Sequence, residues 1–225
     1  PSPPDRFHPD GPPAPESRPR DGGRVVVRLE SPLASFNALI DNTAVVKRLL
    51  GELHESLLSR DWESWEFVPR LAREVLIEDT LVLASGERLF GRVQRGEGQV
   101  TLTPASPEHP LREPVTFPAD QVAEVLPETV FTFLLRDDVR WHDGHPFDAR
   151  DVLFTFRCTK NPHVPCAQRF SSDKLERCEA LGPHAVRFTL ARPYFQARAI
   201  FEGLTLQPAH LLDLSDPDNP DHRSG

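Results

Sequence analysis

The segment VFTFLLRDDVRWHDGHPFDARDVLFTFR, residues 130–157, decides the fold of this chain. It opens with β-branched, aromatic and other apolar residues, and this composition predicts a strand. The sequence His142-Asp143-Gly144 predicts a tight turn, since its glycine can adopt a positive φ without a steric penalty. Asp148 and Asp151 have the spacing of a capping box, which predicts the start of a helix. The segment therefore encodes a strand, a turn and a capped helix in that order.

These parts, in this order, resemble the signature segment of the family 5 solute-binding proteins, which are extracytoplasmic receptors of ABC importers for oligopeptides, dipeptides, nickel and related solutes. The helix start in that family is usually Thr-Ala-Glu-Asp-Val, and this chain has Asp-Ala-Arg-Asp-Val at residues 148–152. Aspartate in place of threonine keeps a capping oxygen, so the difference is conservative. Further blocks that resemble the family are LHESLL (53–58), FVPRLA (67–72), HAVRFTLARPYF (184–195) and LTLQPAHLL (204–212).

This resemblance implies an α/β fold, namely the first lobe of a type II periplasmic-binding-protein fold. Family members continue into a second lobe and hold solute between the lobes, so we expect only the first lobe here. The implied function is capture of a peptide or other small polar solute and its delivery to an ABC transporter permease. No enzymatic chemistry and no cofactor are expected. The implied location is the periplasm or the cell surface, peripheral to the membrane and tethered by an anchor upstream of Pro1.

The composition excludes some other partners. The chain has 225 residues and a formal net charge of −8, with no basic stripe, which argues against nucleic acid and anionic membranes as partners. No apolar run is long enough for a transmembrane helix. The chain starts with proline and contains no methionine, so we expect a processed or trimmed product whose export signal lay upstream.

Prolines and polar residues dominate the start and the end of the chain. Residues 1–23 are rich in Pro, Asp, Arg and Gly and almost without apolar side chains. We expect a disordered linker there, with a frayed terminus as the alternative. Residues 214–225 are expected to form a disordered tail.

An insertion is expected to interrupt the lobe. The lobe would consist of residues 24–78 and 129–213, and the insertion would occupy residues 79–128. Short strands separated by glycine turns predict a small β-barrel-like module within it. The expected strands lie at 80–83, 88–93, 99–103, 114–118 and 122–126. We interpret the module as a surface insertion without its own ligand; if it instead docks a partner, the alternative function is a non-transport protein-interaction module derived from a solute-binding protein.

Before the insertion, we expect a strand over 24–30 and a helix from Asp41-Asn42-Thr43 to about Ser59. Leucine and valine recur at helical spacing across this second segment and predict one apolar face. His54 and Glu55 are then interpreted as a half-exposed pair on that helix, not as catalytic groups.

The candidate ligand-binding residues are Asp41, Asn42 and Thr43. In the receptors that the chain resembles, this loop faces the cleft. A carboxylate, a carboxamide and a hydroxyl could hydrogen-bond to the amine or the backbone of a peptide. The same residue types are also the preferred helix caps, so capping alone is the competing interpretation.

Metal and nucleophile sites have less support. His142 and His145 flank a turn, but no third ligand accompanies them at helical or hairpin spacing, so we interpret them as turn residues. The cysteines Cys158, Cys166 and Cys178 lack the spacing of a zinc site and any local motif of a cysteine nucleophile. They are expected to be buried and inert, with a single disulfide as the alternative.

Overall fold

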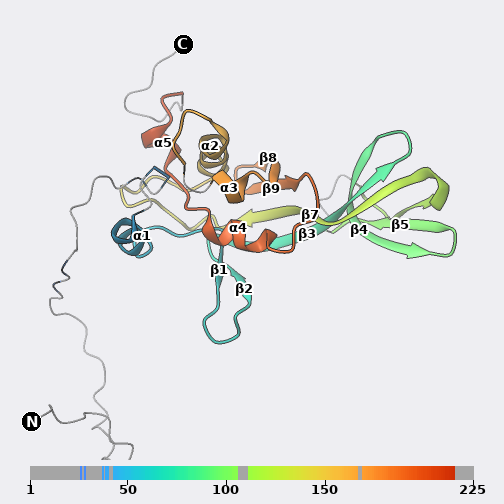
Figure 1. The fold of residues 1–225 in the computed structure, drawn as a ribbon, viewed down its shortest axis with the longest axis horizontal. Helices are drawn as coiled ribbons and strands as arrows, with labels where there is room; N and C mark the ends of the chain where they lie inside the picture. The colour runs from blue at the N-terminus through green and yellow to red at the C-terminus, as the bar shows by residue number, and fades with distance from the viewer. Residues whose placement is uncertain are drawn as a thin grey trace, which may run out of the picture. The chain divides into compact units, whose positions relative to one another are not determined.

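The computed structural model describes residues 26, 28, 37, 39, 40, 43–105, 111–166 and 169–215. The chain divides into two compact units, Pro1–Pro32 and Leu33–Gly225, and the second unit is described here (Figure 1). Most of the expected strand over 24–30, the expected linker and most of the expected tail lie outside the described residues; of that strand only Val26 and Arg28 are described. Within the described residues, no helix combines the length and the apolar character needed to cross a membrane.

One antiparallel sheet organises the second unit. Its seven strands are hydrogen-bonded in the order β6-β5-β4-β3-β7-β9-β8. The strands are β3 (Ala72–Leu83), β4 (Arg88–Gly96), β5 (Gln99–Thr103), β6 (Val115–Pro118), β7 (Val122–Leu135), β8 (Leu175–Gly182) and β9 (Ala185–Leu190). The sequence predicts strands over Leu175–Ala180 and Ala185–Leu190 that pair as a hairpin, and the pairing of β8 with β9 confirms it. The long strands β3 and β7 lie side by side at the centre, so they connect the two halves of the sheet (Figure 1).

Helices pack on the face of β7 and β9 that carries Phe131, Phe133 and Phe188. Phe131 and Phe133 of β7 contact Phe201 of α4 (Ala197–Gly203), with ring centroids 5.1 and 4.8 Å apart. Phe188 of β9 contacts Phe201 at 5.0 Å and also Phe156 of α2 (Ala149–Lys160) at 6.0 Å. The four phenylalanines of β7, β9 and α4 are fully buried and form the centre of the main core. Two short helices complete this part, α3 (Arg169–Ser172) and α5 (Ala209–Leu212).

The helix start predicted from the signature segment is confirmed. The Asp148 side chain accepts the backbone N–H of Arg150 at 2.7 Å. The Asp151 side chain accepts the backbone N–H of Asp148 at 3.1 Å, which completes the capping box. The helix ends at Lys160, before Asn161 and Pro162, as expected from the helix-breaking effect of proline.

The helix predicted to run to about Ser59 is wrong beyond its first two turns. Helix α1 covers Ala44–Leu50 and is followed by Gly51. Leu57 and Leu58 are 0% and 1% exposed and belong to the main core, not to a helix face. Leu58 starts strand β1 (Leu58–Arg60), which pairs with β2 (Phe67–Pro69) in a separate two-stranded hairpin. Burial in the core thus overrides the helical spacing of the leucines.

The predicted barrel-like module is also wrong, because its strands form no closed barrel. They extend the main sheet: β3 and β7 continue into residues 79–128, and β4, β5 and β6 are added beside β3. The end strand β6 pairs with β5, and β7 pairs with β3 and β9, so the order stays open. Leu81, Val100 and Leu102 form a small second core under these strands.

A bulge interrupts the pairing of β3 with β7. The pairing of β3 with β7 shifts between Glu78 and Thr80, and Glu128 has a φ of +48°. The carboxylate of Asp79 accepts the backbone N–H of Glu128 and that of Val93, each at 2.9 Å. The expected limits of the insertion, residues 79 and 128, therefore lie inside β3 and β7 at this bulge.

Candidate functional site

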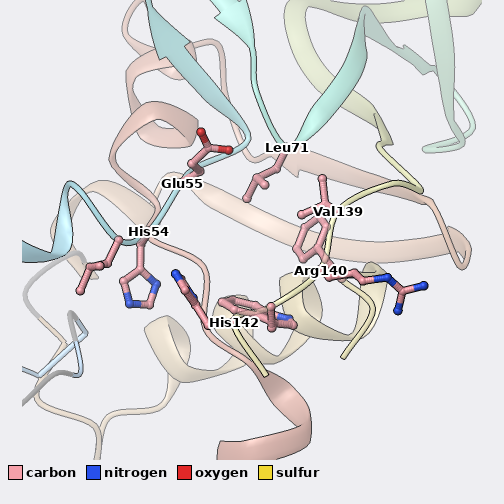
Figure 2. Close-up of a pocket in the computed structure, with 9 residues that line it drawn as sticks. His54, Glu55, Leu71, Val139, Arg140 and His142 are labelled. Atoms are coloured by element: carbon pink, nitrogen blue, oxygen red, sulfur yellow. The ribbon is translucent and has the colours of Figure 1, made fainter. Parts of the chain in front are cut away.

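A cavity of about 200 Å³ lies where the segment after α1 meets the turn after β7. Its apolar part comes from Leu53, Leu71, Val139, Trp141 and Phe147, and its polar part comes from His54, Glu55, Arg140 and His142. Figure 2 shows the imidazole of His54 directed toward His142, whereas the side chains of Glu55 and Arg140 extend away from that pair. The cavity thus combines an apolar floor with polar groups of both charges.

Trp141 forms part of the floor and is held in place by the helix that follows it. Its indole N–H donates to a carboxylate oxygen of Asp151 at 3.0 Å. Its ring meets the rings of His54 and Phe147 edge-on, with centroids 6.4 and 6.2 Å apart. The signature segment therefore contributes to the cavity through the same residues that cap α2.

Asp151 is buried at this junction and satisfied by three donors. Besides Trp141 and the backbone of Asp148, it accepts the backbone N–H of Ala209 at 2.8 Å. Burial raises the pKa of Asp151 above its ordinary value, and the hydrogen bonds from Ala209, Trp141 and Asp148 oppose this rise. Asp151 thus links the turn before α2 to α5.

His54 is a neutral imidazole at neutral pH. Burial lowers its pKa, the backbone carbonyl of Leu206 opposes this effect, and the nearby His142 lowers the pKa further. Among the described residues, the buried Nδ1 atom of His54 has no hydrogen-bond partner. A neutral ring in this position can offer a polar contact beside an apolar surface without bringing a charge into the cavity.

His142 and His145, considered above as a metal pair, have different surroundings. His142 lines the cavity, whereas His145 stacks on His210 of α5, with ring centroids 3.8 Å apart and an interplanar angle of 9°. His210 also forms a hydrogen bond of 2.7 Å with Asp143, which lowers the pKa of this carboxylate. Across the residues that the structure describes, no three His, Cys, Asp or Glu side chains are grouped as metal ligands.

The structure describes one of the three candidate residues from the loop before α1. Thr43 is the N-cap of α1, and its hydroxyl accepts the backbone N–H of Val46 at 3.4 Å. Asp41 and Asn42 lie outside the described residues. The capping role of Thr43 is therefore observed, and ligand binding by these residues stays a prediction.

Residues 113–224 match the model of a family described as "Bacterial extracellular solute-binding proteins, family 5 Middle". The chain belongs to the family 5 solute-binding proteins. A curated relative, Protein XP55 of Streptomyces lividans, is 34% identical over 92 residues, which are 40% of this chain and 16% of the relative.

Solved structures share the family 5 fold of this chain. A NikZ structure from Campylobacter jejuni, in complex with Ni(L-His), has a TM-score of 0.52 and 23% identity, covering 87% of this chain and 29% of NikZ. Listeria monocytogenes OppA bound to peptide has a TM-score of 0.52 and 13% identity, covering 81% of this chain and 30% of OppA. The chain thus spans less than a third of either structure, and at these identities the likeness concerns the fold alone.

Sequence reasoning missed the residues that line the cavity of this family 5 chain. His54 and Glu55 follow α1 in irregular backbone, so their interpretation as a helix pair is wrong. The sequence pattern gives Trp141 no role in a site and places His142 in a turn. The one available signal was that His54 and His142 each lie within a block that resembles the family; nothing in the sequence brings the two blocks together.

Proposed function

We propose that this chain is the first-lobe part of an extracytoplasmic solute-binding component of an ABC importer, and that it binds a peptide or similar small polar solute. The observation that carries this proposal is the cavity between His54 and Trp141. Family 5 membership supports solute binding as the general role. The peptide-bound OppA structure, which shares the fold, supports the choice of peptide.

The polar groups around the cavity suit a zwitterionic solute. Arg140 can pair with a carboxylate, and Glu55 can pair with an ammonium group. The indole of Trp141, together with Leu71 and Phe147, provides an apolar surface for a side chain. A volume of about 200 Å³ is below the usual range for a whole drug-sized ligand, so the cavity would hold one residue of a peptide.

A second set of contacts is proposed at Asp41, Asn42 and Thr43. Their oxygen and amide groups can hydrogen-bond to the peptide amine or backbone. Closure of a second lobe over the solute would complete the site, since two-lobed binding proteins close around their ligands by hinge motion. Delivery to an ABC permease would follow from this closed state.

The experiment is a thermal melt of the chain with and without a pool of di- to pentapeptides, because a ligand that binds only the folded state raises the midpoint. The proposal expects an increase that depends on peptide concentration. Arg140→Gln and Glu55→Gln are expected to reduce it, whereas Arg95→Gln, an exposed control in β4, leaves it unchanged. An unchanged midpoint at saturating peptide, or equal shifts in all variants, would contradict binding at this cavity.

A further inference from the structure

The hairpin of β1 and β2 ends in an exposed aromatic and acidic loop, DWESWE, residues 61–66, called here the tryptophan tip. Trp62 is 80% exposed and Trp65 is 69% exposed. Figure 1 shows the β1–β2 hairpin projecting away from the sheet, and its strands form a two-stranded sheet of their own. Two large apolar side chains are therefore displayed at the end of a protruding element.

Hydrogen bonds to Asp61 hold the tryptophan tip in one conformation. A carboxylate oxygen of Asp61 accepts the backbone N–H of Glu63 at 3.1 Å and that of Ser64 at 2.8 Å. The Ser64 hydroxyl donates to the same oxygen at 2.9 Å. The backbone of Asp61 also pairs with Glu66 and Trp65, at 2.8 and 2.9 Å. The two indoles are thus presented by an ordered loop, which lowers the entropy cost of binding.

The fold itself gives no reason for a tryptophan at position 65. Trp65 has a φ of +61°, a region that bulky residues rarely adopt and that Gly or Asn adopts at lower cost. Its side chain is mostly exposed, so core packing does not compensate for this conformation. The indole of Trp65 is therefore accessible to another molecule.

The charge of the tryptophan tip indicates the chemistry of that molecule. The tip carries three carboxylates, Asp61, Glu63 and Glu66, and no basic residue. The nearest arginine in sequence, Arg60, lies over the Phe67 ring at 4.2 Å and pairs with Glu202 of α4 at 3.5 Å, so it is engaged at the base of the hairpin. Negative charge disfavours an anionic membrane surface and favours a cationic partner.

We propose that the tryptophan tip is a docking site for a protein segment that presents arginine or lysine side chains. The cationic groups would lie on the faces of Trp62 and Trp65 and pair with Glu63 and Glu66, which combines cation–π and ionic contacts. This surface is separate from the solute cavity, and the proposal does not depend on solute binding. Arginine pairs with an aromatic ring in the same way within the hairpin, at Arg60 and Phe67.

The test uses the 225-residue chain and follows its indole N–H signals by NMR during titration with acetylated, amidated tetraarginine at low salt. The signals of Trp62 and Trp65 are expected to shift and saturate. The third indole, Trp141, donates to Asp151 at 3.0 Å and lines the solute cavity, so its signal reports peptide in the cavity, separately from docking at the tip. Trp62→Phe and Trp65→Phe assign the two exposed signals.

Variants and competing probes decide the outcome. Glu63→Gln with Glu66→Gln should weaken peptide binding by about tenfold, and high salt should do the same. Trp62→Ala with Trp65→Asn removes both reporting indoles, so its binding is measured by titration calorimetry, where it should be abolished. Phe195→Ala, at another exposed aromatic residue (91%), should have no effect. The proposal is overturned if the two tip signals do not shift with tetraarginine, if tetraglutamate binds as well, or if vesicles of phosphatidylcholine and phosphatidylglycerol bind the tip and tetraarginine does not.

Discussion

Asp151 accepts the indole N–H of Trp141 at 3.0 Å, and its second oxygen accepts the backbone N–H of Ala209 at 2.8 Å. With the capping bond to the backbone of Asp148, one carboxylate that is 3% exposed joins three segments of the chain. The same carboxylate therefore starts α2, fixes the floor of the cavity and anchors α5.

We predict that Asp151→Ala lowers the free energy of unfolding by about 3 to 5 kcal/mol, because three donors lose a charged acceptor in a buried position. Asp151→Asn should also destabilise the protein, since its amide group can accept on one side only. Urea unfolding measures both effects. Asp138→Asn, at an exposed carboxylate, is the control and should change stability little. If Asp151→Ala had the same free energy of unfolding as the wild type, this junction would not be required for the fold.

The stability of the protein should fall as the pH drops below about 6.5, the ordinary pKa of histidine. Burial lowers the pKa of His54 in the folded state, so between that lower value and 6.5 the unfolded chain binds a proton that the folded chain does not. His54→Gln should reduce this pH dependence, while His163→Gln, at an exposed histidine, should not. Urea unfolding between pH 5 and pH 8 (about three units around this pKa) tests the prediction, and equal slopes for wild type and His54→Gln would contradict it.

Strand β4 changes partner at Gly91, and this glycine should be essential for the insertion. Residues 88–91 pair with β3 and residues 92–96 pair with β5. Gly91 has a φ of +156°, and a Cβ atom there would lie 2.8 Å from the carbonyl oxygen of Thr103. Gly91→Ala should therefore destabilise the protein by about 3 kcal/mol through backbone strain.

A matched variant separates strain from the general cost of replacing glycine. Gly98 has a φ of +70°, but a Cβ atom there meets nothing within 4 Å, so Gly98→Ala should cost only about 1 kcal/mol. Hydrogen exchange is expected to show faster opening of β4 and β5 in Gly91→Ala. Equal losses of stability in the two variants would mean that the backbone at Thr103 moves away from a Cβ atom at position 91 at little cost.

The three cysteines should react slowly with thiol reagents in the native state. All are free in the structure, and Cys166 is 8% exposed. Burial, with a contribution from Glu179, raises the pKa of Cys178 to about 12, and burial also raises the pKa of Cys158. Since the thiolate is the reactive form, native labelling at pH 8 should be about 100-fold slower than labelling in urea. Rapid labelling of the native chain would contradict this, and a missing thiol in urea would indicate a disulfide.

Local chemistry explains which parts of the fold were predicted. The capping box of Asp148 and Asp151, the turn at Gly144 and the hairpin of β8 and β9 each depend on residues that are close in the sequence. The limits of the insertion, residues 79 and 128, stay a prediction, because β3 and β7 run continuously through these two positions. The open arrangement of the strands within residues 79–128 was not predicted. Which strand pairs with which depends on the twist and bending of the sheet, as at Gly91 in β4.

The sequence by itself determined that residues 130–157 form a strand, a turn and a capped helix, and that the chain resembles the family 5 solute-binding proteins. Only the tertiary structure decided where α1 ends, because Leu57 and Leu58 gain more from burial in the core than from continuing a helix. It also decided that His54 shares a cavity with Trp141 and His142, and that the tryptophan tip remains uncovered. The cavity depends on contacts between segments that are distant in the sequence, and the tip depends on the absence of such contacts. Short-range residue preferences encode neither.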